Sequence, residues 1–239
     1  MTAIFYPDNA TSKKITWSSS NTGVATVDQS GKVTAVKAGS ATITVTTTDG
    51  GYTATCSVTV KTPEAVDLGL PSGLKWASFN LGASKPEECG GYYQWGGTQD
   101  VTSTTINLGF ENCPYHTGSD YSIGWTKYVQ SDKSAFWSGN GSPDNKTVLD
   151  PEDDVAHVKL GGKWRMPTIA EFQELINNCT SEWTTLNGVN GRKFTSKTNG
   201  NSIFLPAAGY RNKDHVGNLG SKSYYSSSSI EDTYPWGAY

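Results

Sequence analysis

Acidic residues gather in one short stretch of the chain, where they could take part in metal binding. The stretch holds Asp150, Glu152, Asp153 and Asp154, and carboxylate oxygens are the ligands that calcium prefers. Their spacing does not match the ligand loop of an EF-hand. Pro151 favours the start of a helix, and negative charge is stabilising at a helix N-terminus, so the stretch also fits a solvated first turn. We assign it no metal and no cofactor.

Histidines form no catalytic or metal-binding pattern with the other residues of the chain. The three histidines are His116, His157 and His215. They lie in unrelated segments, so the sequence does not group a nucleophile with a base and a stabilising residue. Cys113 and His116 have the spacing of one zinc ligand pair, but no second pair follows at the distance found in zinc fingers. We therefore predict no catalytic residue and no metal site, and we expect that the protein is not an enzyme.

The four cysteines are scattered along the chain, which argues against a disulfide scaffold. Cys89 and Cys113 flank an aromatic, Gly-rich segment, and they either pair in an oxidising compartment or stay reduced. Cys179 follows a predicted helix and is expected to be a small buried residue.

Aromatic side chains could bind sugars, because a ring face packs on the apolar face of a hexose. The chain has 8 tryptophans and 12 tyrosines. We expect Trp76, Trp95 and Trp164 in the core, and Trp125 and Trp137, which lie in loop-like segments, as an exposed pair. Carbohydrate binding through that pair is one hypothesis for the function.

One amphipathic helix must position much of the chain after residue 66. Thr168 is a predicted N-cap, with Glu171 completing a capping box, and Pro167 keeps the preceding residue out of helical space. Apolar residues then recur at helical spacing, at Ile169, Phe172, Leu175 and Ile176. We therefore expect this helix to lie on a core. A second, short helix is predicted over residues 151–158, with Pro151 in its first turn.

Residues 3–60 alternate apolar and β-prone polar residues with period two, which predicts a small β-sandwich. The expected strands are 15–18, 25–27, 32–36, 41–46 and 54–60, separated by turns such as Asp49-Gly50-Gly51. Residues 62–65 form a predicted linker, where Pro63 ends the last strand. Two further short strands are expected within residues 66–77, around a Pro-Ser-Gly turn.

The overall composition excludes some classes of partner. The chain has 239 residues with 19 basic and 22 acidic side chains, so it has no excess of positive charge that would attract nucleic acid. No apolar run approaches the roughly 18 residues of a membrane span, and the N-terminus lacks the features of a signal peptide. We expect no direct membrane insertion, and any targeting segment lies outside this sequence.

The N-terminal strands also carry a specific order of residues. Trp17-Ser18-Ser19-Ser20-Asn21, Val24-Ala25-Thr26-Val27-Asp28 and Gly31-Lys32-Val33-Thr34-Ala35 resemble the bacterial immunoglobulin-like domain of group 2, a spacer and adhesion module of surface proteins. Members of that family usually begin with two strands upstream of the Pro7 segment. The resemblance therefore implies an N-terminally incomplete immunoglobulin-like domain over residues 1–61.

The rest of the chain resembles a second family. The motifs are Asn80-Leu81-Gly82-Ala83, Tyr92-Tyr93-Gln94-Trp95-Gly96, Trp164-Arg165-Met166-Pro167-Thr168 and Leu205-Pro206-Ala207-Ala208-Gly209-Tyr210-Arg211. Together they look like the major paralogous domain abundant in gut Bacteroidetes and Fibrobacter. That resemblance implies a variant of the C-type lectin-like fold, shared with formylglycine-generating enzymes and with the variable proteins of diversity-generating retroelements. The expected fold class is an N-terminal all-β immunoglobulin-like sandwich plus an α+β C-type lectin-like domain over residues 66–239.

The resemblance also implies that residues 207–239 build the ligand-binding face. Tyr, Ser and Asn are abundant there, as in binding surfaces that combine rigid contact area with adaptable hydrogen bonds. The candidate ligand-binding residues are Asn212, Lys213, Asp214, His215, Asn218, Ser221, Ser223, Tyr225, Ser226, Asp232, Tyr234 and Trp236. We expect Tyr225, Tyr234 and Trp236 to be the anchors, and the smaller polar residues to tune specificity.

The first functional hypothesis is a non-enzymatic ligand-binding protein that recognises a protein or glycan on a cell surface. It would act outside the cell, on a cell surface or a phage virion, with a binding segment that is either diversified by a retroelement or invariant. The second is the carbohydrate-binding module. The third, an enzyme similar to formylglycine-generating enzymes, would need a redox-active cysteine pair near the C-terminus, and no cysteine follows Cys179.

Overall fold

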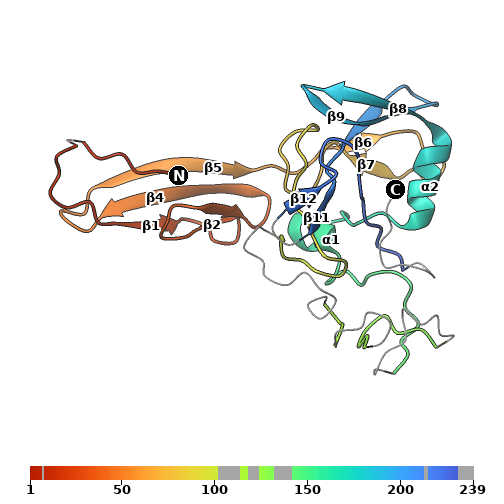
Figure 1. Ribbon diagram of the computed structural model, residues 1–239, viewed down its shortest axis with the longest axis horizontal. Coiled ribbons are helices and arrows are strands. Elements are labelled where there is room, and N and C mark those ends of the chain that lie inside the picture. The colour runs from red at the N-terminus through yellow and green to blue at the C-terminus, as the bar shows by residue number, and fades with distance from the viewer. Residues whose placement is uncertain (7, 102–113, 118–123, 132–141, 213–214, 231–239) are drawn as a thin grey trace. The chain divides into compact units, whose positions relative to one another are not determined.

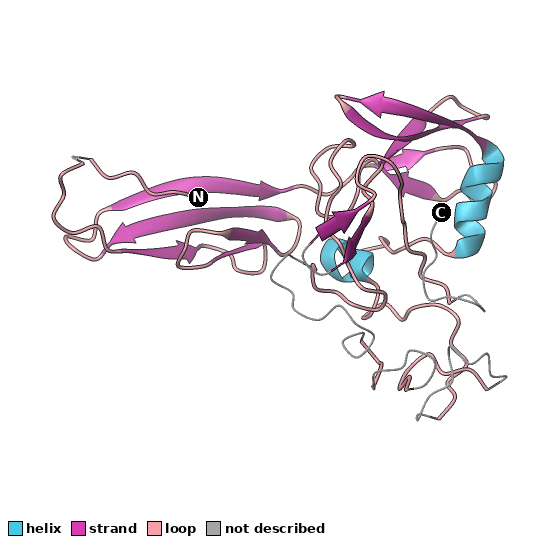
Figure 2. Cartoon of the chain, in the orientation of Figure 1, coloured by secondary structure: helices cyan, strands magenta, loops and turns pink. Residues whose placement is uncertain are grey.

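The chain divides into two compact units, Met1–Thr62 (unit 1) and Pro63–Tyr239 (unit 2). The computed structural model describes residues 1–6, 8–101, 114–117, 124–131, 142–212 and 215–230. Within these residues, Figure 2 shows strands and loops in unit 1, and two helices together with strands in unit 2.

Unit 1 is built from antiparallel strands. They are β1 (Ile15–Ser19), β2 (Ala25–Val27), β3 (Val33–Ala35), β4 (Gly39–Thr47) and β5 (Thr53–Val60). The order β1-β4-β5 forms one sheet, and β2 pairs with β3 in a hairpin. Val24, Ala25 and Ala41 are buried between these strands. The strands form where the period-two pattern predicts them, and the architecture agrees with the predicted immunoglobulin-like sandwich.

Unit 2 combines short antiparallel sheets with two helices. Its elements are β6 (Ala65–Asp67), β7 (Lys75–Ala77), α1 (Val155–Leu160), α2 (Ile169–Asn178), β8 (Cys179–Leu186), β9 (Val189–Ser196), β10 (Ser202–Pro206), β11 (Tyr210–Asn212) and β12 (His215–Gly217). Strands β10-β9-β8 form a three-stranded sheet, and α2 runs directly into β8 (Figure 1). Asn187 and Gly188 connect β8 to β9 with φ angles of 48° and 83°, the positive values that a two-residue hairpin turn requires.

Helix α2 begins as the sequence predicts. The Thr168 side chain accepts a hydrogen bond from the backbone N–H of Glu171, and the Glu171 carboxylate accepts one from the backbone N–H of Thr168. This capping box satisfies two donors that have no partner within the helix. Of the four apolar residues at helical spacing, Phe172 and Leu175 are buried, Ile169 is half-buried and Ile176 is 39% exposed. The expectation that α2 lies on a core is confirmed.

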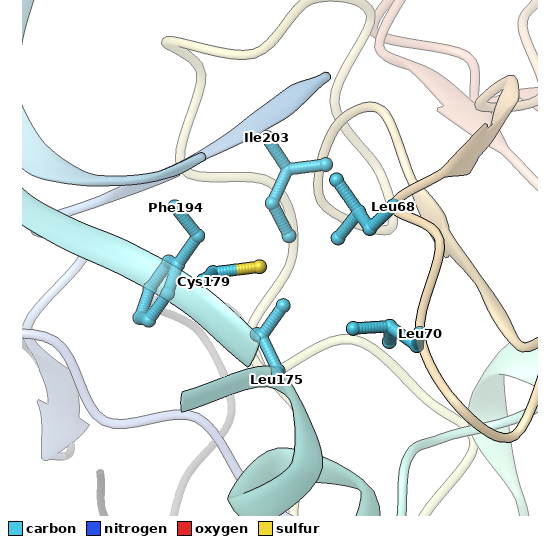
Figure 3. Close-up of a cluster of buried hydrophobic side chains, with 6 residues drawn as sticks. All are labelled: Leu68, Leu70, Leu175, Cys179, Phe194 and Ile203. Carbon is cyan, nitrogen blue, oxygen red and sulfur yellow. The ribbon is translucent and has the colours of Figure 1, made fainter. Parts of the chain in front are cut away.

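The core of unit 2 lies between α2 and the three-stranded sheet. Figure 3 shows its side chains, which come from the segment after β6 and from α2, β8, β9 and β10: Leu68, Leu70, Leu175, Cys179, Phe194 and Ile203. The predicted burial of Cys179 is confirmed.

Helix α1 starts later than the sequence predicts. Asp154, and not Pro151, marks its N-terminus, because the Asp154 carboxylate accepts hydrogen bonds from the backbone N–H groups of Ala156 and His157. The same carboxylate accepts from the backbone N–H of Met166 at 2.8 Å. Asp154 therefore ties α1 to the segment that leads into α2.

Candidate ligand-binding site

Unit 2 contains a cavity of about 420 Å³, within the size range of small-molecule sites. Its wall is assembled from segments that are distant in sequence. They are residues 74–77 on and around β7, residues 79–81, residues 91–95, residues 163–167 before α2, and the C-terminal stretches 208–211 and 224–226. Most of the motifs identified in the sequence of this unit therefore contribute residues to the wall of one cavity.

Tyrosine rings beside cations form part of this wall. The Tyr92 hydroxyl donates to the Ala208 carbonyl oxygen at 2.7 Å, and the guanidinium carbon of Arg211 lies 5.2 Å from the centroid of the Tyr92 ring. Lys159 Nζ lies 5.7 Å from the centroid of the Tyr93 ring. Burial raises the pKa of both tyrosine hydroxyls, so they stay neutral and act as hydrogen-bond donors.

The C-terminal segment is fixed to the rest of unit 2 near the start of α2. The backbone N–H of Ser228 donates to the Pro167 carbonyl oxygen at 2.8 Å, and the backbone N–H of Ile169 donates to Ser229 Oγ at 3.3 Å. Ser227 and Ser228 are fully buried. The helix that organises the core thus also holds the segment from which ligand contacts are expected.

Two side chains of the C-terminal segment bond to the same backbone carbonyl of unit 2. The hydroxyls of Ser223 and Tyr225 both donate to the Pro206 carbonyl oxygen at 3.0 Å. Asn80 Nδ2 donates to the Tyr225 hydroxyl at 2.9 Å. The Tyr225 hydroxyl is therefore engaged within the protein while the residue lines the cavity, and its role as a ligand anchor stays a prediction.

Tyr224, between these inward residues, is exposed and forms an aromatic pair with Tyr210. Their ring centroids are 5.3 Å apart in an edge-to-face arrangement, and Asn218 Nδ2 donates to the Tyr224 hydroxyl at 3.0 Å. Both rings also line the cavity. Neither tyrosine was among the predicted site residues. The period-two alternation of an extended segment could have indicated that only one of Tyr224 and Tyr225 faces outward.

The structure places the other predicted residues as follows. Asn212, His215, Asn218 and Ser221 are exposed but do not line the cavity, whereas the half-buried Ser226 does. The remaining candidates lie outside the described residues: Lys213, Asp214, Asp232, Tyr234 and Trp236.

The predicted sugar-binding pair of tryptophans is not supported. Trp125 is only 2% exposed and packs in a second core cluster with Trp95 and Tyr128, so its ring has no free face for a sugar. Trp137 lies outside the described residues. The predicted burial of Trp95 is confirmed, whereas Trp76 and Trp164 are half-buried and line the cavity.

The acidic stretch surrounds a lysine. Lys127 Nζ lies 2.7 Å from an Asp150 carboxylate oxygen, 2.6 Å from one of Asp153 and 3.4 Å from one of Glu152. The hydroxyls of Tyr115 and Tyr128 also donate to Asp153. The Lys127 ammonium thus takes the place that a bound cation would have between the three carboxylates. The interpretation as a solvated turn is wrong for Asp153 and Asp154, because both are buried.

Replacing Tyr225 by Phe is expected to destabilise unit 2 by about 1 kcal/mol, because Asn80 loses an acceptor and Pro206 a donor in a partly buried position. Tyr224→Phe, which removes an exposed hydroxyl next door, should change stability by less than about 0.5 kcal/mol. Urea unfolding followed by tryptophan fluorescence measures both. Equal losses for the two variants would contradict the inward placement of Tyr225.

The comparison with protein families identifies the class of unit 1, an immunoglobulin-like domain. Residues 1–58 match the family of bacterial Ig-like domains, group 2. This part of the chain is therefore a group 2 bacterial immunoglobulin-like domain. Among the described residues, no helix has the length and apolar character that crossing a membrane requires.

Three relatives illustrate where similar sequences occur. An alpha-L-arabinofuranosidase of Bifidobacterium longum subsp. longum is 38% identical over 128 residues, and an intimin of Citrobacter freundii is 30% identical over 133 residues. An uncharacterised protein of Clostridium acetobutylicum is 51% identical over 61 residues. These alignments cover 50%, 51% and 25% of this chain, but only 12%, 13% and 6% of the respective relatives.

Proposed function

We propose that this chain is a non-enzymatic ligand-binding protein displayed outside the cell, on a cell surface or a phage virion. In this proposal the immunoglobulin-like domain, which the family match places at residues 1–58, is a non-catalytic spacer, and unit 2 carries the binding site. The observation that carries the proposal is the aromatic-lined cavity of unit 2, with Tyr210 and Tyr224 exposed at its wall. Aromatic side chains that are rigid and exposed are typical of binding hot spots.

Within this proposal, unit 2 is a C-type lectin-like domain and residues 207–239 form its ligand face. The abundance of Tyr, Ser and Asn in that segment supports diversification by a retroelement as the source of its specificity. The test is the neighbouring DNA: a near-copy of the codons for residues 207–239, differing only at adenines and lying beside a reverse transcriptase gene, is expected. Its absence would leave an invariant ligand face.

An enzymatic function has less support. Cys89 lines the cavity, but burial raises the pKa of its thiol, and the thiolate is the reactive form. Burial also raises the pKa of Cys179, in the core. A carbohydrate ligand remains compatible with the half-buried Trp76 and Trp164 of the cavity wall, in place of the predicted Trp125.

The binding function is tested with the full chain on an array of glycans and extracellular matrix proteins. Replacing Tyr210 and Tyr224 together by Ala should weaken any bound ligand at least tenfold, because both exposed rings are removed. Tyr52→Ala, which removes an exposed tyrosine of unit 1, is the matched control and should bind like the wild type. An array without a ligand, or binding that both variants keep, would contradict the proposal.

A further inference from the structure

The charges around the cavity of unit 2 differ in sign from the chain as a whole. The chain has a formal net charge of −3, yet the charged residues that line the cavity are Lys75, Lys163, Arg165 and Arg211 with a single carboxylate, Glu171. The cavity is therefore a local concentration of positive charge, which favours an anionic ligand.

Two of these cations already have a carboxylate partner within the protein. Arg165 forms a two-pronged ion pair with Glu171, with N–O distances of 2.7 and 2.5 Å. Lys75 Nζ lies 3.7 Å from an Asp67 carboxylate oxygen. In the part of the chain that the structure describes, no carboxylate pairs with the other two, Lys163 and Arg211. These two side chains are the ones available to a ligand.

Arg211 is placed to receive a planar anion. Its Nε is buried and donates no hydrogen bond to any described residue, and its guanidinium lies over the Tyr92 ring, 5.2 Å from the centroid. The terminal nitrogens of the guanidinium are therefore the donors that a ligand in the cavity would meet. The fork of guanidinium donors matches the two oxygens of a carboxylate, whereas a lysine ammonium acts as a point charge.

The rest of the wall is suited to a ring. Trp76 and Trp164 are half-buried, Tyr210 and Tyr224 are exposed, and all four side chains line the same cavity as Arg211. A sugar that carries a carboxylate combines an apolar ring face for the aromatic side chains with an anion for the guanidinium. A neutral sugar would leave Arg211 and Lys163 unpaired, and a small aliphatic acid would leave the aromatic wall unused.

We propose that this cavity binds an acidic sugar residue, with the sugar's carboxylate on Arg211 and its ring against the aromatic wall. The inference rests on the proposed ligand-binding function and names the ligand class of the same unit. Lys163 adds long-range attraction at the rim, so binding weakens as the salt concentration rises.

The test is calorimetric titration of the full chain with two matched ligand pairs: sialyllactose against lactose, and trigalacturonate against its methyl ester. At least one acidic probe should bind, and its neutral counterpart should bind at least tenfold more weakly. Arg211→Gln should bind the acidic probe at least tenfold more weakly than the wild type. Arg211→Lys, which keeps the charge but not the fork, should lose most of the same binding. Lys193→Gln, which changes an exposed lysine of β9 that neither lines the cavity nor belongs to residues 207–239, should behave like the wild type.

Equal binding of the acidic and neutral partners, or acid binding that survives Arg211→Gln, would overturn the inference. Tighter binding of glucose 6-phosphate than of either acidic probe would overturn it as well. If Arg211→Gln does not fold, as judged by circular dichroism, Lys163→Gln is tested in its place. Its affinity for the acidic probe should be several-fold weaker than that of the wild type. If neither acidic probe binds but the array yields a ligand that depends on Tyr210 and Tyr224, the acidic-sugar inference fails and the proposed function stands. If the array is also empty, both fail.

Discussion

Replacing Asp153 by Ala should destabilise unit 2 by about 3 kcal/mol, because it leaves a lysine and two tyrosine hydroxyls without a shared acceptor in a buried position. The Asp153 side chain is 3% exposed, whereas Glu152, the third carboxylate near Lys127, is 69% exposed. Glu152→Ala is therefore the matched control, with an expected change of less than about 1 kcal/mol.

Chemical unfolding followed by tryptophan fluorescence measures this difference in unit 2. Trp17 lies in unit 1, and all the other tryptophans lie in unit 2, so the signal comes chiefly from the unit that the substitution affects. A loss for Asp153→Ala as small as that expected for Glu152→Ala would show that the ion pairs around Lys127 are no more than solvated surface contacts.

The same network gives the stability of unit 2 a defined pH dependence. Burial raises the pKa of Asp153, but hydrogen bonds from Lys127, Tyr115 and Tyr128 outweigh burial and hold the pKa below the ordinary 3.8. Since the folded-state pKa is the lower one, this stabilisation is complete above about pH 4 and is lost as the pH falls through the folded-state value. Asp153→Ala should remove that part of the acid sensitivity, whereas Glu152→Ala should retain it.

At high pH the stability of unit 2 changes with pH in the opposite direction, because of Lys127. Burial lowers the pKa of Lys127, but hydrogen bonds to Asp150 and Asp153 outweigh it and raise the pKa above its ordinary range. The contribution of the lysine is therefore present below about pH 10 and is lost as the pH rises through the folded-state pKa.

Local signals in the sequence predict the strands of unit 1 and, in unit 2, the two helices and the short strands β6 and β7, but they do not indicate β8 to β12. The capping box of Thr168 and Glu171 spans four residues and fixes the start of α2, and period-two alternation locates the strands of unit 1. The acidic stretch shows where such signals fail. The lysine that neutralises Asp153 lies 26 positions upstream, so local composition suggests a solvated turn where the fold builds a buried ion pair.

The candidate site was harder to predict because no sequence window contains it. The residues of the cavity wall range in sequence from those near β7 to Ser226. Single hydrogen bonds also join residues that are similarly distant in sequence. Asn80 and Tyr225, whose hydrogen bond decides which of two adjacent tyrosines faces inward, are 145 positions apart. Alternation indicates that only one of the two tyrosines is exposed. The hydrogen bond from Asn80 to Tyr225 leaves Tyr224 as the exposed one.

Leu175→Ala is expected to destabilise unit 2 by about 3 kcal/mol, and Ile176→Ala by about 1 kcal/mol or less. Helical periodicity places both residues on the apolar face of α2, and both substitutions remove a branched aliphatic side chain from the same turn. Leu175 is fully buried among Leu68, Cys179 and their neighbours (Figure 3), whereas Ile176 is 39% exposed. The first substitution leaves a cavity that the sheet cannot close, and the second leaves a gap that water fills. Urea unfolding of the two variants should therefore give a difference of about 2 kcal/mol, and equal losses would mean that α2 packs on the sheet with a different face.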